Sequence, residues 1–141
     1  MIADDAPTAV LDTNVVLDWL VFHDASVAPL VAAVESGALR WLASARMRAE
    51  LAHVICRAEL VGWDFQAERV LAMVDRHAQF CDEPGSSLLV CSDPDDQVFI
   101  DLALGRRSRW LFTRDKALLR LARGAERFGT TVCQPQVWLT P

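Results

Sequence analysis

The chain has 141 residues, of which 52% are hydrophobic, and its formal net charge at neutral pH is −5. This length predicts a single domain over residues 1–141 with a sizeable buried core, and the apolar content excludes an intrinsically disordered chain. No apolar stretch approaches the ~20 residues that a membrane span needs. The first eight residues carry two acids and no base, so we expect neither a membrane anchor nor a secretory signal.

In chain order, the hydrophobic pattern predicts a strand at 9–11, helices at 15–20 and 26–36, a strand at 39–43, helices at 44–61, 64–80 and 93–104, a strand at 110–113, a helix at 115–124, a strand at 130–133 and a turn at 135–139. Strands that alternate with helices are typical of a parallel sheet covered by helices on both faces. We therefore predict a three-layer α/β/α fold with four to five short strands.

Turn and capping residues mark the boundaries of these elements. Ser44 and Asp93 are expected to cap the helices that follow them, and Gly37 and Gly124 are expected to end the helices that precede them. Residues 88–91 form a brief apolar run, which fits either a strand or an extended segment.

The four cysteines are scattered along the chain and show no C-x-x-C spacing: Cys56, Cys81, Cys91 and Cys133. This spacing favours neither a disulfide framework nor a zinc site. We expect reduced thiols in a cytoplasmic protein.

Charge is unevenly distributed along the chain. Residues 105–127 contain eight arginines or lysines and two acids, a net charge of +6, so the remainder of the chain carries −11. Such a separation fits an acidic pocket beside a basic rim. A solvated, arginine-rich helix face would give the same pattern.

Acidic residues follow two of the predicted strands. Asp12 comes directly after the first strand, and Asp115 comes two residues after Thr113, the end of the strand at 110–113. The carboxyl ends of parallel strands meet at one edge of the sheet, which is where ligands bind in open α/β folds. We therefore expect these two carboxylates at the same edge.

Helical geometry places further acids. At ~100° per residue, Asp96 shares the core-facing side of its helix with Phe99 and Ile100. Asp101 is about 140° away from Asp96 and is expected in solvent. Glu50 lies at the border of the apolar stripe of its own helix.

Taken singly, each of these acids has an ordinary structural explanation, because acids cap helices and favour helix N-termini. Brought together without a cation, they would repel one another. Mg²⁺ and Mn²⁺ suit such oxygen ligands. The joint pattern therefore predicts a divalent metal site formed by Asp12, Glu50, Asp96 and Asp115.

Other motifs are absent or isolated. There is no G-x-G-x-x-G, no P-loop and no G-x-S-x-G, so dinucleotide binding, P-loop nucleotide binding and a serine-hydrolase elbow are not supported. The three histidines stand alone, and the five tryptophans are expected to fill the core.

Four segments resemble motifs of the PIN-domain ribonucleases, in particular the VapC-like toxins of toxin–antitoxin pairs: LDTNVVLDWL, the acid in RAELAHVI, DPDDQVFIDLAL and LFTRDKALL. The resemblance covers nearly the whole chain. By position it implies a catalytic and metal-binding quartet of Asp12, Glu50, Asp96 and Asp115, supported by Asn14 and Thr113. Asp93 is the alternative to Asp96, although its capping role and the helical phase favour Asp96.

The resemblance also implies an activity and partners. It implies an endoribonuclease that depends on Mg²⁺ or Mn²⁺, is usually homodimeric and is paired with a cognate antitoxin. The RNA backbone is expected to contact the basic residues near the acids, Arg46, Arg48, Arg114 and Lys116.

Two other functions stay open at this point. One is a catalytically inactive PIN-fold module that binds RNA or a protein. The other is a phosphatase or phospho-acceptor domain with Asp12 as the nucleophile. The phosphatase form expects an acid where Asn14 stands, and the acceptor form expects paired acids before a preceding strand, so both are less supported.

Overall fold

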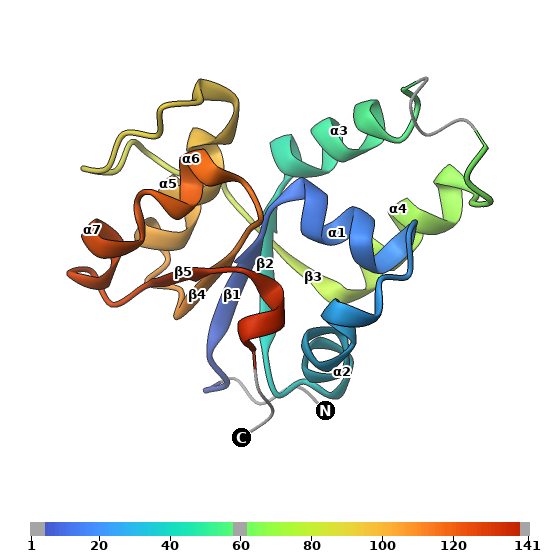
Figure 1. Cartoon of the computed structure of the whole chain (residues 1–141), viewed down its shortest axis with the longest axis horizontal. Coiled ribbons are helices and arrows are strands. Elements are labelled where there is room, and N and C mark those ends of the chain that lie inside the picture. The colour runs from blue at the N-terminus through green and yellow to red at the C-terminus, as the bar shows by residue number, and fades with distance from the viewer. Residues whose placement is uncertain (1–4, 58–61, 139–141) are drawn as a thin grey trace.

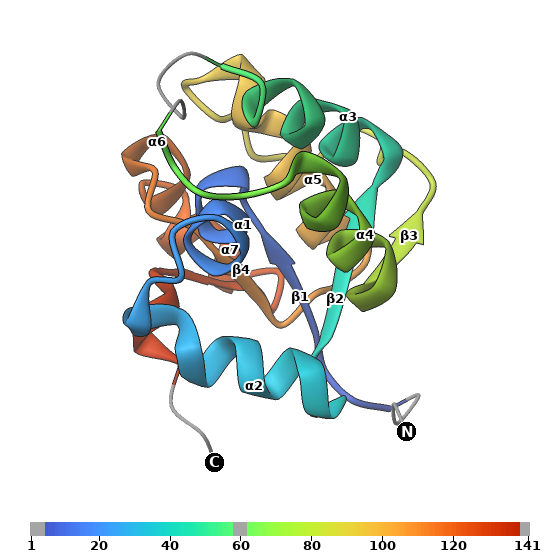
Figure 2. The same cartoon turned by 90° about the vertical axis from the view of Figure 1, so that its right-hand side faces the viewer.

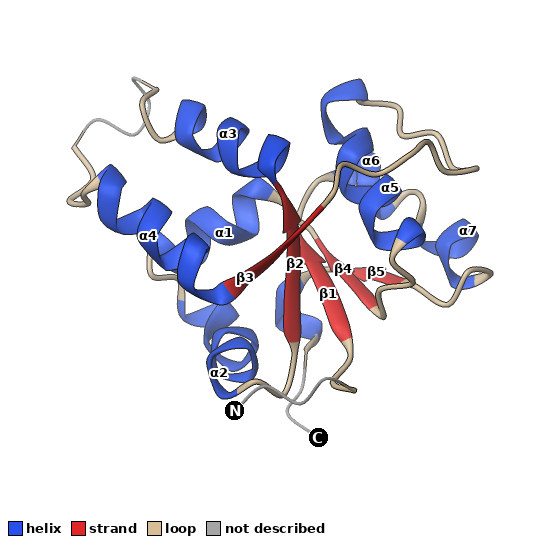
Figure 3. Ribbon diagram, turned by 180° about the vertical axis from the view of Figure 1, so that it is seen from behind, coloured by secondary structure: helices blue, strands red, loops and turns tan. Residues whose placement is uncertain are grey.

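The computed structural model describes residues 5–57 and 62–138, and its centre is a five-stranded parallel sheet (Figures 1 and 3). The strands are β1 (Thr8–Leu11), β2 (Arg40–Ser44), β3 (Ala78–Cys81), β4 (Trp110–Phe112) and β5 (Thr131–Cys133), in the order β3-β2-β1-β4-β5. Every neighbouring pair is parallel. The predicted three-layer α/β/α fold is confirmed.

Helices cover both faces of the sheet. They are α1 (Thr13–Leu20), α2 (Ala28–Ser36), α3 (Ala45–Val54), α4 (Ala67–His77), α5 (Gln97–Gly105), α6 (Lys116–Leu119) and α7 (Ala122–Glu126), with short 3₁₀ turns η1 (Ala25–Val27), η3 (Pro94–Asp96) and η4 (Pro135–Val137). Helices α1 to α4 lie on one side, and α5 to α7 lie on the other (Figure 3).

Alternating side chains of β1 supply both cores. Ala9 and Leu11 pack with α1, α2 and α4, whereas Val10 packs with α5 and α6, and all three residues are buried. Because successive side chains of a strand point to opposite faces, a central strand covered on both faces must be apolar throughout. The short apolar run at residues 9–11 has this character.

The two ends of the sheet carry different helices. Helix α2 lies at the amino end of the sheet, and α3 lies at the opposite end, directly after β2 (Figures 1 and 2). Ser44 caps α3 as predicted, through a hydrogen bond from the Met47 N–H to its Oγ. The carboxyl ends of the strands are therefore where side chains from the adjoining turns can meet.

Two helices are shorter than predicted. The described part of α3 ends at Val54, with residues 58–61 of the predicted helix outside the described residues. The predicted helix at 64–80 is wrong at both ends. Helix α4 spans only Ala67–His77, and residues 78–80, predicted as the end of the helix, belong to strand β3. This edge strand is defined by its hydrogen bonds to β2, and such a distant partner leaves little local signal.

The prediction that Gly124 ends a helix is also wrong. Helix α6 ends at Leu119, and Gly124 lies inside α7. A Cβ atom at Gly124 would lie 3.1 Å from the Leu89 Cδ2 atom. The glycine therefore allows residues 87–91, which form an extended segment and no strand, to approach α7 closely.

The expectation that Asp101 lies in solvent is wrong as well. Its side chain is only 9% exposed, because residues 87–91 pack over that side of α5. Its Oδ1 atom accepts hydrogen bonds from the Ser87 N–H and from Gln97 Nε2. The helical phase is correct, but it cannot show that another segment covers this face.

Most of the tryptophans fill the core as expected. Trp19 and Trp41 are buried against each other, and Trp138 packs edge-on against Trp110. Trp63 is the exception, since it is 51% exposed.

No single helix of the described residues is long and apolar enough to cross a membrane, although α1 and the η1–α2 segment, bent by 108° from each other, meet the length and composition requirement together.

Candidate metal centre

Asp12 lies in the interior at the end of β1. Its backbone N–H donates to the Phe112 carbonyl at 3.1 Å, which extends the pairing of β1 with β4. Its Oδ1 atom accepts from the Val15 N–H at 3.0 Å and so caps α1. Asp12 as a whole is only 3% exposed. Burial raises the pKa of Asp12 to about 6, against the hydrogen bonds from Thr113 and Val15, which favour the charged form.

Thr113 connects the ends of β1 and β4. Its hydroxyl donates to Asp12 Oδ2 and accepts from the Asp115 N–H at 2.9 Å, and its side chain is fully buried. Asp115 in turn caps α6, accepting from the Ala117 N–H at 2.8 Å. The two strand-to-acid junctions therefore lie at the same edge of the sheet and share one hydroxyl.

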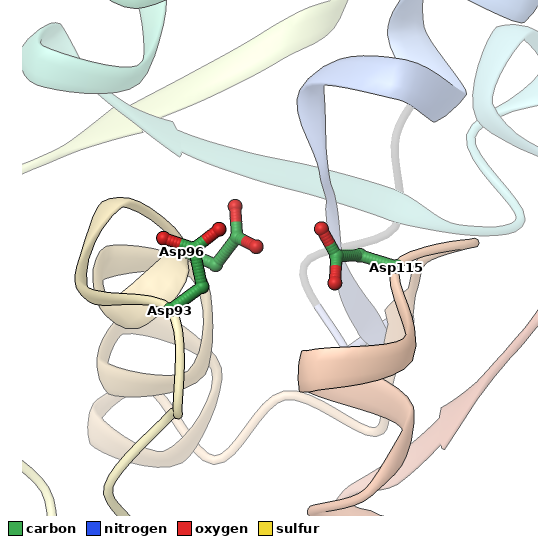
Figure 4. Close-up of side chains that lie close together, drawn as sticks. All are labelled: Asp93, Asp96 and Asp115. Carbon is green, nitrogen blue, oxygen red and sulfur yellow. The ribbon is translucent and has the colours of Figure 1, made fainter.

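A second group of acids approaches from the turn before α5. One carboxylate oxygen from each of Asp93, Asp96 and Asp115 lies within 4.8 Å of the others. Figure 4 shows Asp93 and Asp96 leaving the turn η3 and facing Asp115, which comes from the start of α6. The sequence offers Asp93 as the alternative to Asp96, but the structure brings both to the cluster.

Asp96 has an unusual environment for a carboxylate. Its Oδ2 atom is buried and has no hydrogen-bond partner among the described residues. Burial, and then the neighbouring carboxylate of Asp115, raises the pKa of Asp96 to about 8. A buried polar atom without a partner is rare in folded proteins, and an ion is one of its explanations.

All four predicted acids line one cavity of about 130 Å³. Its walls are formed by Asp12, Thr13, Asn14, Glu50, Val54, Arg57, Asp96 and Asp115. Glu50 reaches it from α3 and accepts a hydrogen bond from the Thr13 hydroxyl at 3.1 Å. The ligand atoms offered by this set are oxygens, which fits Mg²⁺ or Mn²⁺ rather than zinc.

The model of the PIN domain family matches residues 8–117, from β1 to the start of α6. The chain belongs to the PIN domain family. No curated protein and no solved structure matches it. PIN domains are in general metal-dependent nucleases, and the cluster of Asp93, Asp96 and Asp115 is compatible with such a site.

The supporting residues of this PIN domain are placed around the acids. Thr113 connects Asp12 and Asp115, and Asn14 lies on the cavity wall. The sequence reasoning missed Arg57, which lines the cavity together with Glu50 and Val54. A signal was available within the helix predicted at 44–61, where positions 50, 54 and 57 follow the i, i+4, i+7 spacing of one face, although α3 ends at Val54 in the structure.

The basic residues predicted to contact RNA lie outside this cavity. Arg48 is paired with Asp75 at 2.7 Å on the surface, and Arg46 and Lys116 are exposed. The side chain of Arg114 is 29% exposed and is held by partners within the chain, since its Nε atom pairs with Asp18 and its two terminal nitrogens donate to the side chains of Ser26 and Gln136. The guanidinium thus connects the residue after β4 with α1, η1 and η4, and it does not line the cavity.

Proposed function

We propose that this PIN domain, with residues 1–141 as one domain, is an endoribonuclease that uses Mg²⁺ or Mn²⁺ to hydrolyse phosphodiester bonds in RNA. The observation that carries the proposal is the buried Oδ2 atom of Asp96, which has no hydrogen-bond partner among the described residues and lies in a cluster of carboxylates from the turn before α5 and the start of α6. Burial makes the charged forms of Asp12 and Asp96 unfavourable and raises their pKa values, and for Asp96 the neighbouring carboxylate of Asp115 adds to this effect. A divalent ion would offset both the burial and the repulsion.

The proposed ligands are Asp12, Asp96 and Asp115, which were predicted from the sequence, together with Asp93, which the structure brings to the cluster. A bound ion supplies the positive charge that binds the scissile phosphate and lowers the pKa of the attacking water. Glu50 has one oxygen occupied by Thr13, so we assign its other oxygen, Oε1, as the acceptor of a proton from that water. In-line attack opposite the 3′ oxygen would leave a 5′ phosphate.

Substrate contacts are proposed at two distances from the acids. Arg57 and Asn14, which line the cavity, would hold the scissile phosphate. Arg46, Arg48 and Lys116 lie further out and would contact the flanking backbone. Because these contacts neutralise phosphates, RNA binding should weaken as the salt concentration rises. We leave Arg114 out of this set, since three of its nitrogens have partners inside the chain.

We further propose that the protein is the toxin of a type II toxin–antitoxin pair, acting as a cytoplasmic homodimer. This role is supported by the resemblance of its motifs to those of the VapC-like group. An antitoxin encoded beside it would occupy the acidic cavity and block access of RNA.

Cleavage of RNA by the purified protein tests the nuclease. Wild type, Asp96→Asn and the control Glu35→Gln would be incubated with end-labelled single-stranded RNA in Mn²⁺, Mg²⁺ or EDTA. Glu35 is an exposed acid on α2, at the other end of the strands. We expect metal-dependent cleavage by wild type and Glu35→Gln and loss of cleavage in Asp96→Asn.

Two results would contradict the nuclease. Equal cleavage by wild type and Asp96→Asn would indicate a contaminating activity. RNA binding without cleavage, in either metal and across single-stranded and hairpin substrates, would instead support the inactive binding module.

The toxin role has its own test. Induced expression in a bacterial host should arrest growth with wild type and not with Asp96→Asn, and co-expression of the adjacent reading frame should restore growth. Normal growth with an active nuclease would remove the toxin role and leave the nuclease in place.

A further inference from the structure

Residues 87–91 have the side-chain alternation of a β-strand but pair with no strand of the described residues. Leu88 and Val90 are 83% and 79% exposed, whereas Leu89 packs toward Gly124 and Cys91 is buried. Backbone groups of such a segment that are shielded from water need partners, which in a sheet are supplied by a neighbouring strand. Its position matters because it leads, two residues later, to Asp93.

Two side chains of α5 take the place of the missing strand. The Ser87 N–H donates to Asp101 Oδ1 at 2.9 Å. The Leu89 carbonyl accepts from Gln97 Nε2 at 2.8 Å, and the Cys91 N–H donates to Gln97 Oε1 at 2.7 Å. In an extended chain, the backbone groups of alternate residues point to the same side. The three contacts therefore cover one edge of the segment.

Gln97 and Asp101 act as a unit. They lie one helical turn apart on α5, and Gln97 Nε2 also donates to Asp101 Oδ1 at 2.9 Å. The Gln97 amide thus donates and accepts at once, a pattern that few other side chains can reproduce. Neither residue lines the acidic cavity. A buried carboxylate is costly unless it is hydrogen-bonded, so the burial of Asp101 is explained by the segment that it binds.

We propose that Gln97 and Asp101 are positioning residues that hold Asp93 within the metal centre, an inference that rests on the proposed nuclease function. Asp12 and Asp115 follow strands β1 and β4, and Asp96 is the last residue of η3, directly before α5. Asp93 instead lies two residues after the segment 87–91 and caps η3, accepting from the Asp95 N–H at 3.0 Å. Loss of the Gln97 contacts would free Asp93 and leave the other acids in place.

The affinity for Mn²⁺, measured by titration calorimetry, tests the proposal. Gln97→Met keeps the length and charge of the side chain but removes all of its hydrogen bonds. Asp101→Asn is the conservative control, because its amide oxygen still accepts from Ser87 and Gln97. We expect Mn²⁺ to bind about 10-fold more weakly to Asp93→Asn and to Gln97→Met, and within about 2-fold of wild type to Asp101→Asn.

A double variant separates positioning from general damage. If Gln97 acts through Asp93, Gln97→Met should not weaken Mn²⁺ binding further in the Asp93→Asn background. A further loss of about 10-fold there, or wild-type affinity in folded Gln97→Met or in Asp93→Asn, would overturn the proposal. A wild-type protein that binds no Mn²⁺ would overturn the proposed function as well, which distinguishes the two failures.

Hydrogen exchange in the wild-type protein tests whether Gln97 holds residues 87–91, and it needs no variant. The Cys91 amide, bonded to Gln97 Oε1, should exchange much more slowly than the amides of exposed Leu88 and Val90. Equal exchange rates for these amides in the wild-type protein would overturn the proposal that Gln97 holds residues 87–91. This result does not depend on whether Gln97→Met folds.

Discussion

The two halves of the metal centre are fixed by different kinds of interaction. Asp12 and Asp115 follow neighbouring strands whose register pairs Leu11 with Phe112. The Thr113 hydroxyl connects the two residues, because it donates to the Asp12 carboxylate and accepts from the Asp115 backbone N–H. Asp93, by contrast, lies two residues after the segment 87–91, which is held by side chains of α5. The first half therefore rests on the backbone of the sheet, and the second depends on the identity of supporting side chains.

This difference predicts which substitutions matter in each half. A backbone ladder tolerates many side chains, so function in the first half should be sensitive mainly to its acids and to Thr113. In the second half, a neutral supporting residue should matter about as much as the acid that it holds. The expected effects are largest for the buried acids and smallest at the cavity wall.

Asp12→Asn should cause the largest loss, a fall of more than ~100-fold in the rate of RNA cleavage, because it removes a buried charge from the proposed ligand set. The amide oxygen can still cap α1 through Val15, but the amide nitrogen cannot accept from the buried Thr113 hydroxyl, so the free energy of unfolding should fall by no more than ~1–3 kcal/mol. Single-turnover cleavage in saturating Mn²⁺ measures the effect. Asp93→Asn should lose only about 10-fold, and equal losses in both variants would remove the distinction between the halves.

Thr113→Val should lower both activity and stability. It removes the hydroxyl that binds Asp12 and the Asp115 N–H, which should reduce cleavage by ~10- to 100-fold. It should also lower the free energy of unfolding by ~1–3 kcal/mol, measured in urea, because two buried polar groups lose a partner. Thr113→Ser keeps the hydroxyl and should behave like wild type, so a Ser variant as impaired as Val would argue against this role.

Binding of Mn²⁺ should strengthen with pH. Carboxylates bind the ion in their ionised form, and the pKa values of Asp12 and Asp96 are raised to about 6 and about 8. The affinity, measured by calorimetry, should therefore increase between pH 6 and pH 8 by up to ~10-fold per unit. A flat affinity over this range would contradict the raised values.

The metal-free protein should show the opposite trend in stability. A carboxyl group with a raised folded pKa binds protons more tightly when folded, so its favourable contribution is present below its unfolded value of ~3.9 and is lost as the pH rises through the folded value. In EDTA, the free energy of unfolding should fall between pH 5 and pH 8. Asp96→Asn should flatten this profile in its upper part, and an unchanged profile would count against the assignment.

Arg57→Ala should have the smallest effect, because it removes one phosphate contact at the cavity wall and no acid. We expect RNA binding to weaken by ~3- to 10-fold. The slope of the logarithm of the binding constant against the logarithm of the salt concentration should fall in magnitude by about one. Arg76→Ala is the matched control, since Arg76 is an exposed residue of α4 that does not line the cavity. A larger loss in Arg76→Ala than in Arg57→Ala would move the RNA path away from the cavity.

The sequence predicted the elements whose signals are local. The run at residues 9–11, the cap at Ser44, the glycine stop at Gly37 and the helix start at Asp93 are all present in the structure. Each depends on neighbouring residues alone, through hydrophobic spacing or a cap within three residues. Strand β3 was missed because its ladder is formed with β2, far away in sequence.

The candidate site shows the same division at the level of single residues. Strand order and helical phase are enough to expect Asp12, Asp96 and Asp115 at one edge, since parallel strands share their carboxyl ends. The same signals wrongly place Asp101 in solvent and offer Asp93 only as the alternative to Asp96. The surroundings of both residues depend on the path of residues 87–91, which these signals do not describe. Helical phase describes a helix and not the segment that covers it.

The amino-acid sequence by itself therefore determined the layered fold and the acids that follow its strands, because periodicity and capping act between residues close along the chain. Only the tertiary structure decided that Asp93 joins the cluster and that Gln97 and Asp101 bind residues 87–91. It also decided that Asp96 Oδ2 is buried with no partner in the described part of the chain. These properties depend on desolvation and on contacts between distant segments, which exist only once the chain has folded.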